Sequence, residues 1–145
     1  MNTNIQEIKD LSIGFNSQKG EQISILRNIT TNIRKGETVG IVGESGSGKS
    51  TLALAMMGYI KHGLFTTGGE CLFKSQNLLS LNNKELEDIR GRKIAMIPQN
   101  AGQALTPNLK IGYQIEEALK LHTDFTKTER EQKISELLNQ VRLPS

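Results

Sequence analysis

The amino-acid sequence predicts an α/β fold, and three observations support this class. Apolar and polar residues alternate in the first third of the chain, which is typical of antiparallel β-structure. A glycine-rich turn, residues 43–51, lies between an apolar strand candidate and an apolar helix candidate. Beyond Pro107 the apolar spacing becomes helical. We expect an N-terminal antiparallel β-subdomain, a partial parallel core with one buried helix, and the start of a helical subdomain.

The first third predicts a β-hairpin. Apolar residues follow a two-residue period on either side of a turn-like stretch at residues 16–20. Lys35 and Gly36 then form a second turn, after which residues 38–42 read as a short buried strand. The alternating residues are Leu11, Ile13 and Phe15 before the turn, then Ile23, Ile25, Ile29 and Ile33 after it.

The turn after this strand candidate matches the phosphate-binding loop pattern G-x-x-x-x-G-K-[ST]. Glycine lacks a Cβ atom, so the backbone can take left-handed dihedrals and approach a ligand closely. Successive N–H groups can then form an anion-binding nest, and the following helix adds the positive end of its dipole. The pattern comprises Gly43, Glu44, Ser45, Gly46, Ser47, Gly48, Lys49, Ser50 and Thr51.

Two side chains of this loop have expected roles with phosphate. Lys49 supplies a positive charge for β- and γ-phosphates, and the Ser50 hydroxyl is an oxygen ligand suited to Mg²⁺. The alternative reading is a flexible Gly/Ser linker that contains a lysine. The apolar flanks at residues 38–42 and 52–57 argue against a linker.

The middle of the chain predicts one helix apolar on all sides, then shorter elements. The helix follows the loop and covers residues 52–57, with Gly58 and Gly63 as end signals. Asn82 and Glu85 resemble a capping box that opens a helix reaching Arg90. Strand candidates are residues 70–73 and, buried and ended by Pro98, residues 94–97.

The last third predicts two helices. One apolar stripe contains Ile111, Ile115, Ala118 and Leu119, and another contains Ile134, Leu137, Leu138 and Val141. Thr126 and Glu129 read as a capping box between them. We expect a subdomain boundary near residue 100, giving a β-subdomain and loop-containing core at 1–100 and the beginning of a helical subdomain at 101–145.

Composition excludes several classes of protein. The 145 residues contain one cysteine, so an internal disulfide and a cysteine-rich metal site are excluded, and Cys71 is expected to pack as a small apolar residue. The net charge of +3 is scattered and aromatic residues are 4%, which argues against nucleic-acid binding. We expect no signal peptide and no transmembrane segment.

These residues together resemble the ATP-binding subunit of an ABC transporter from its N-terminus onward. The resemblance rests on residues 40–51, on about 40 β-rich residues before them, on Phe15, and on the segment Ile97-Pro98-Gln99-Asn100 before the helices. It implies ATP and Mg²⁺ as ligands. By resemblance, Phe15 stacks on adenine, although a core role is equally open, and Gln99 reaches Mg²⁺ and the attacking water when the site closes.

The segment at residues 99–107 resembles the peptide/nickel importer ATPases more narrowly. Ala101 stands where that group usually has proline, and Thr106 stands where it has Asn or Asp. The implied function is coupling of ATP hydrolysis to solute import. Implied partners are transmembrane permease subunits and a second ATPase subunit, identical or different, at the cytoplasmic face of the membrane.

The pattern of the family's second half is missing from this sequence. There is no Ser-Gly-Gly-Gln signature and no apolar strand ending in Asp-Glu. The switch histidine that follows this strand in the family is also missing, and neither His62 nor His122 substitutes for it. We therefore expect a truncated ABC ATPase of marginal stability that is not catalytically competent alone. Two alternatives remain: a non-catalytic nucleotide-binding fragment, or another P-loop enzyme such as a small-molecule kinase. The lid of a kinase would carry clustered arginines, whereas Arg90 and Arg92 are the only close pair in the middle of this sequence.

Overall fold

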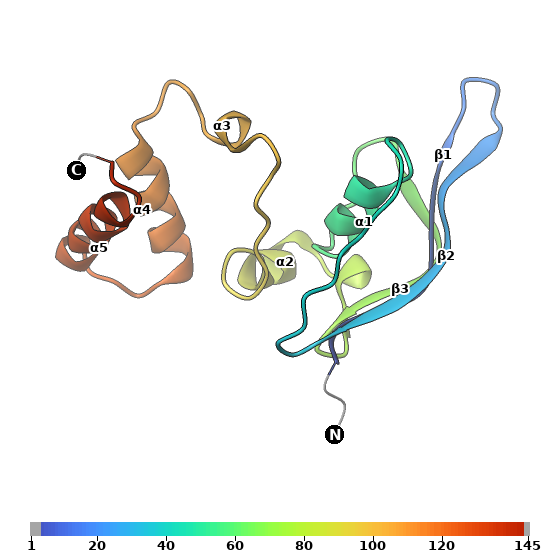
Figure 1. Cartoon of the computed structure of the whole chain (residues 1–145), viewed down its shortest axis with the longest axis horizontal. Coiled ribbons are helices and arrows are strands. Elements are labelled where there is room, and N and C mark those ends of the chain that lie inside the picture. The colour runs from blue at the N-terminus through green and yellow to red at the C-terminus, as the bar shows by residue number, and fades with distance from the viewer. Residues whose placement is uncertain (1–3, 144–145) are drawn as a thin grey trace. The chain divides into compact units, whose positions relative to one another are not determined.

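The computed structural model describes residues 4–143 (Figure 1). The chain folds into two compact units, one up to Glu87 and one from Asp88. The first holds the strands and the helix that follows the glycine loop. The second holds the later helices. The described elements are β1 (Asn4–Asn16), β2 (Gln22–Arg34), α1 (Lys49–Ala55), β3 (Phe65–Phe73), β4 (Gln76–Asn77), a 3₁₀ turn (Leu78–Ser80), α2 (Asn83–Ile89), α3 (Ala101–Ala104), α4 (Ile111–His122) and α5 (Lys127–Gln140).

The predicted N-terminal hairpin is confirmed. β1 and β2 pair antiparallel, and the turn between them is closed by the Ser17 N–H, which donates to the Glu21 carbonyl at 2.8 Å. The sheet has the order β2-β1-β3-β4 (Figure 1). β3 is longer than the predicted strand at residues 70–73, because pairing with β1 extends it back to Phe65.

An irregularity crosses the sheet at one level. The β1 register shifts between Ile8 and Leu11, and Asp10 has a positive φ of 48°. Asn28 on β2 and Gly69 on β3 also have positive φ values, of 47° and 84°. A bulge moves side chains to the opposite face of a strand, so Ile8 and Leu11 are both buried despite their odd spacing.

The core of the first unit lies between this sheet and α1. Cys71 is fully buried there, and burial raises the pKa of its thiol, although a hydrogen bond from Gln6 acts the other way. The expectation that Cys71 packs as a small apolar residue is therefore confirmed. The buried members of this core are Ile8, Leu11, Ile13, Leu26, Leu52, Ala55 and Cys71.

Helix α1 differs from its prediction in how deeply it is buried. Leu52 and Ala55 are buried against the sheet, but Ala53, Leu54 and Met57 are half-buried. The helix therefore packs firmly on one side, not on all sides as its composition suggested. Its predicted end signal fits, because Gly58 follows the helix with a φ of 70° and donates to the Ala55 carbonyl.

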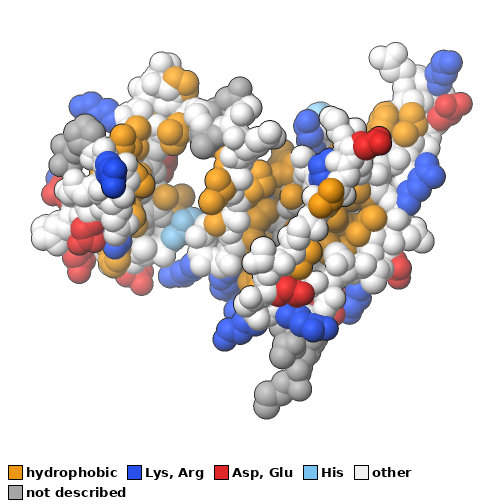
Figure 2. Space-filling view, viewed as in Figure 1, with side chains coloured by type: hydrophobic (Ala, Val, Ile, Leu, Met, Phe, Trp, Pro, Cys, Tyr) orange, Lys and Arg blue, Asp and Glu red, His pale blue; other side chains and the backbone are white. Residues whose placement is uncertain are grey.

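Two predicted buried strands are wrong. Residues 38–42 form no strand, and their apolar side chains are exposed, Val42 to 96%. Residues 94–97 make one isolated bridge between Ile94 and Arg90, and Ile97 is 92% exposed. A strand needs a hydrogen-bonded neighbour, and within residues 4–143 no named strand pairs with either segment. Figure 2 shows hydrophobic side chains gathered on the drawn face around α1 and the segment before it.

The predicted helix starts of the later chain are confirmed. Asn82 and Glu85 exchange backbone-to-side-chain hydrogen bonds of 2.9 and 3.1 Å, so they form a capping box at α2. Thr126 and Glu129 form the second box, at α5. The stripes of α4 and α5 face each other in part but contain no buried residue. In the described residues, no helix has both the length and the apolar character needed to cross a bilayer.

Candidate functional site

The glycine loop between residues 43 and 48 is folded by three glycines with different constraints. Gly46 and Gly48 have positive φ values of 81° and 89°, in the region that favours glycine. Gly43 does not, but a Cβ atom there would stand 2.8 Å from the Ser47 hydroxyl oxygen. The Ser47 N–H donates to the Glu44 carbonyl at 3.2 Å. The left-handed backbone that glycine permits therefore occurs at Gly46 and Gly48, and at Gly43 a side chain would require Ser47 to move.

Gly48 also fixes the loop to the sheet. A Cβ atom at this position would lie 2.7 Å from Cδ2 of Leu26 and 3.4 Å from Cγ2 of Ile25, both on β2. Leu26 is itself buried in the core. The start of α1 is therefore seated directly on the hairpin, which sequence reasoning did not anticipate because only the folded chain brings these residues together.

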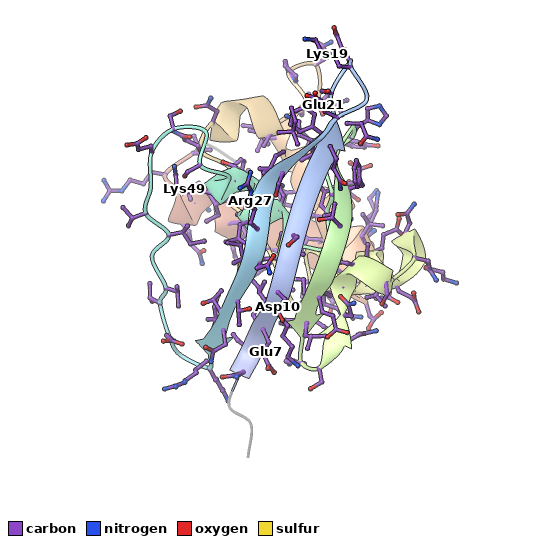
Figure 3. All side chains as sticks on the ribbon, turned by 90° about the vertical axis from the view of Figure 1, so that its right-hand side faces the viewer. Glu7, Asp10, Lys19, Glu21, Arg27 and Lys49 are labelled. Atoms are coloured by element: carbon purple, nitrogen blue, oxygen red, sulfur yellow. The ribbon has the colours of Figure 1, made fainter. Side chains whose placement is uncertain are left out.

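Lys49 folds back across the loop instead of extending into solvent. Its ammonium group donates to the carbonyl oxygens of Gly43 at 2.8 Å and Glu44 at 2.6 Å, and lies 3.3 Å from the Ser47 hydroxyl. Figure 3 shows Lys49 at the loop beside the strands of the hairpin. A positive charge is thus held at the loop by the loop's own carbonyl oxygens.

The start of α1 has no side-chain cap. Within residues 4–143, the structure gives no hydrogen-bond partner to the backbone N–H groups of Lys49, Ser50 and Thr51. Such first-turn amides carry the positive end of the helix dipole and suit an anion. Amides and an ammonium group at one bend are a donor set that fits a polyphosphate.

The candidate metal ligands fall in different units. Ser50 is exposed at the second position of α1, next to the half-buried Thr51. Gln99 is exposed and belongs to the second unit. Among the described residues, no group of three or more His, Cys, Asp or Glu side chains could hold a metal ion. Hydroxyl and amide oxygens such as those of Ser50 and Gln99 are ligands that suit Mg²⁺.

Phe15 lies near the end of β1, is half-buried and pairs with Ile23 of β2. It belongs to the same unit as the glycine loop. The two histidines are not part of the loop: His62 is exposed, and His122 is the last residue of α4, with its ring packed against Gly91.

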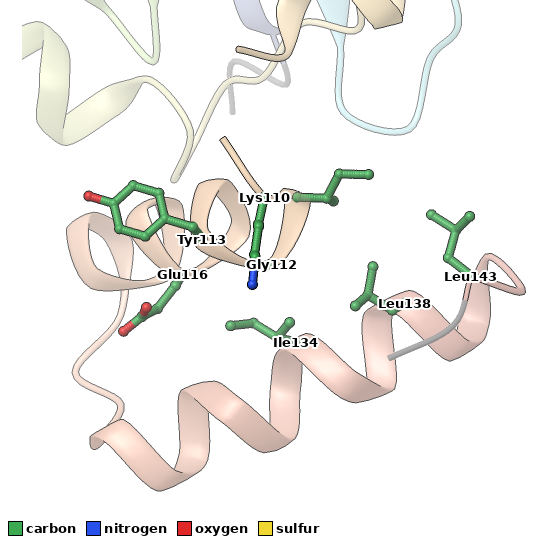
Figure 4. A pocket seen from close by; sticks show the side chains of 8 residues that line it. Lys110, Gly112, Tyr113, Glu116, Ile134, Leu138 and Leu143 are labelled. Atoms are coloured by element: carbon green, nitrogen blue, oxygen red, sulfur yellow. The ribbon is translucent and has the colours of Figure 1, made fainter. Parts of the chain in front are cut away.

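A cavity of about 640 Å³ lies in the second unit, between α4 and α5 (Figure 4). Its wall is mainly apolar, with Lys110 and Glu116 as its charged residues. It contains no glycine-rich turn and does not include Gln99. The other lining residues are Ile111, Gly112, Tyr113, Ile134, Leu138 and Leu143.

Comparison with known proteins agrees with the loop. Residues 26–145 match the family model described as ABC transporter. The chain belongs to the ABC transporter family. This confirms the resemblance drawn from residues 40–51 and 97–100, and it makes the linker reading of the glycine loop untenable.

Relatives of this ABC transporter chain include two peptide-transport proteins. It is 39% identical to the oligopeptide transport ATP-binding protein OppD of Bacillus subtilis, over 98% of this chain and 40% of the relative. It is 38% identical to the dipeptide transport ATP-binding protein DppD of Lactococcus lactis subsp. cremoris, over 97% of this chain and 40% of the relative. The chain thus spans about 40% of the length of these relatives.

The ABC transporter fold is also seen in a solved structure. The chain matches the dimeric, post-hydrolysis ATP-binding cassette MJ0796 bound to ADP and Pi, with a TM-score of 0.81 and 29% identity. The match covers 97% of this chain and 58% of that one. The predicted α/β fold class, the front part of a P-loop ATPase with an antiparallel β-subdomain, is therefore confirmed.

Proposed function

We propose that this chain binds ATP and Mg²⁺ and forms the nucleotide-gripping part of a peptide-importer ATPase. The observation that carries the proposal is the Lys49 ammonium group, held in a loop whose following helix has first-turn amides with no hydrogen-bond partner among residues 4–143. The names of the relatives, which are oligopeptide and dipeptide transport ATP-binding proteins, support the solute class.

Each residue of the loop has a proposed task. The amides of residues 46–51 hold phosphate oxygens, and the Lys49 ammonium exchanges loop carbonyls for the β- and γ-phosphates. The Ser50 hydroxyl is the protein's ligand to Mg²⁺, and Gln99 joins it when the site closes. Mg²⁺, when bound, neutralises charge on the phosphates. The side chains of Glu44, Ser45 and Ser47 border the nucleotide, Thr51 supplies a second hydroxyl, and Phe15 stacks on adenine.

The proposed partners follow from the relatives and from the dimeric neighbour. We propose that the chain works with transmembrane permease subunits and a second ATPase subunit. It would then lie at the cytoplasmic face of the membrane through the permease. We propose a subdomain boundary near residue 100, between the β-subdomain with the loop-containing core and the helical region. The helical region, from residue 101 onward, is the proposed permease-facing part.

A sequence observation favours a second candidate function, nucleotide binding without hydrolysis. The sequence has no apolar strand ending in Asp-Glu to orient an attacking water. As given, the polypeptide would then bind nucleotide without turning it over. Release of inorganic phosphate from Mg·ATP separates the two: turnover at family-like rates by this chain supports catalysis, and binding without release supports the binding module.

Calorimetry of Mg·ATP binding tests the proposal directly. Lys49→Ala should abolish measurable binding, because it removes the charge partner of the phosphates. Equal affinity in the wild type and Lys49→Ala refutes the loop assignment.

Phe15→Leu should weaken the binding of ATP. It should leave the binding of inorganic tripolyphosphate unchanged, because the phosphate contacts are untouched. Equal losses for the two ligands argue for a core role of Phe15.

A further inference from the structure

One buried amide connects the sheet to the far end of the loop helix. Gln6 lies on β1 and is 6% exposed. Among the described residues it is the one polar residue that is buried. Its Nε2 donates to the carbonyl oxygen of Met56 at 3.1 Å and lies 3.3 Å from Sγ of Cys71 on β3. A single side chain thus joins β1, β3 and the C-terminal cap of α1.

Helix α1 is consequently held at both of its ends. At its start, Gly48 is pressed against Leu26 of β2. At its end, the Met56 carbonyl accepts from Gln6. A helix of seven residues is short and rigid. A helix held at one end only can tilt about that end, whereas contacts at both ends fix the direction of its axis.

The direction of α1 controls the geometry of the loop. Lys49, Ser50 and Thr51 form its first turn, so tilting the helix would redirect their amides and the lysine side chain. Hydrogen bonds weaken steeply with misalignment. Anion binding therefore depends on the orientation of α1 as well as on the residues that it carries.

We propose that Gln6 is a positioning residue for the phosphate-binding loop, acting through the Met56 carbonyl. This inference rests on the proposed nucleotide binding. Packing alone does not account for an amide at this place, since Cys71, which Gln6 contacts, belongs to the apolar core. Burying an amide has a cost unless it is hydrogen-bonded, and here the bond goes to the loop helix.

The test compares Gln6→Met with Cys71→Ala in the full chain. Methionine keeps the length of the side chain and removes the donor, whereas alanine at Cys71 removes the sulfur and leaves the Gln6–Met56 bond. We expect Gln6→Met to weaken Mg·ATP binding by roughly threefold to tenfold, the equivalent of one neutral hydrogen bond. Its melting temperature should fall only slightly, because methionine keeps the buried volume although the Met56 carbonyl loses its donor. Cys71→Ala should bind as the wild type does.

Hydrogen exchange supplies a readout that does not need nucleotide. In Gln6→Met without ligand, the amides of Leu52 and Met56 should exchange faster, while that of Arg130 in the second unit should not change. Two results overturn the inference: wild-type affinity with wild-type exchange in Gln6→Met, or an affinity loss that follows the melting temperature in both variants. If the wild type fails to bind Mg·ATP, the proposed function fails, and exchange at Leu52 and Met56 still decides whether Gln6 holds the helix.

Discussion

The Lys49 ammonium group donates a hydrogen bond of 2.8 Å to the carbonyl oxygen of Gly43, at the opposite end of the glycine loop. The same group reaches the Glu44 carbonyl. The loop is therefore closed by its own lysine, and its shape depends on Gly46 and Gly48, whose left-handed φ values favour glycine. Substitutions of individual glycines test this dependence.

Gly48→Ala should damage both stability and nucleotide binding. The new methyl group would stand 2.7 Å from Leu26, and the φ of 89° is unfavourable for alanine. We expect the free energy of unfolding to fall by about 2 kcal/mol or more. Urea unfolding measures this loss. Gly40→Ala is the matched control, because Gly40 has an ordinary φ and no described heavy atom within 4 Å of the new Cβ atom. Equal stability of the two variants would contradict the seating of Gly48 on β2.

Gly69→Ala should disturb the bulge that crosses the sheet. A Cβ atom at Gly69 would lie 2.4 Å from the Asp10 carbonyl oxygen, and this glycine has a φ of 84°. Backbone atoms cannot turn aside as a side chain can, so we expect a loss of about 2–4 kcal/mol in the free energy of unfolding. The neighbouring Gly68→Ala has open space and should be close to neutral. A thermal melt of both variants compares them, and a stable Gly69→Ala protein would show that β1 and β3 are not held in this register.

Gln99→Ala should leave the ground-state affinity for Mg·ATP unchanged. Gln99 is exposed and lies in a different unit from the glycine loop, and its proposed role begins when the site closes around Mg²⁺. Calorimetry on Gln99→Ala and Lys49→Ala in parallel checks this expectation. A loss at Gln99 as large as that at Lys49 would argue against a gating role.

The start of α5 should weaken in acid. The backbone N–H of Thr126, followed by its side chain, holds the pKa of the Glu129 carboxyl below its ordinary value. A carboxyl whose pKa is lower in the folded state stabilises that state at pH values above the unfolded-state pKa, which is about 4.3 for glutamate. This contribution to stability is lost as the pH falls through the folded-state pKa. An NMR titration of Glu129 should show this low pKa, and an ordinary value would contradict the capping box.

Thr126→Ala tests the same cap by mutation. The Glu129 N–H loses its acceptor, and an N-cap of this kind contributes about 1 kcal/mol to helix stability. Far-ultraviolet circular dichroism should show α5 melting at a lower temperature than in the wild type. Thr128→Ala, at an exposed position one residue before Glu129, should not lower the melting temperature, because alanine has the higher helix propensity.

Features that depend on neighbouring residues could be predicted well. The hairpin, both capping boxes and the glycine end of α1 follow from residues close together in the chain, and each has the predicted place. The predicted strands at residues 38–42 and 94–97 failed for the opposite reason. Their apolar composition is suited to a buried parallel sheet, but a strand forms only beside a partner, and composition carries no information about whether that partner is present.

The order of glycines, lysine and hydroxyl residues at 43–51 was enough to predict what kind of ligand the chain could hold, because anion binding by successive amides is a local property of the backbone. Tertiary structure decided how that loop is supported. The contact of Gly48 with Leu26, the bond from Gln6 to Met56 and the bulge at Asp10 and Gly69 join residues far apart in sequence. Their geometry arises only when the sheet and α1 pack together, since no local pattern specifies which distant atoms will meet.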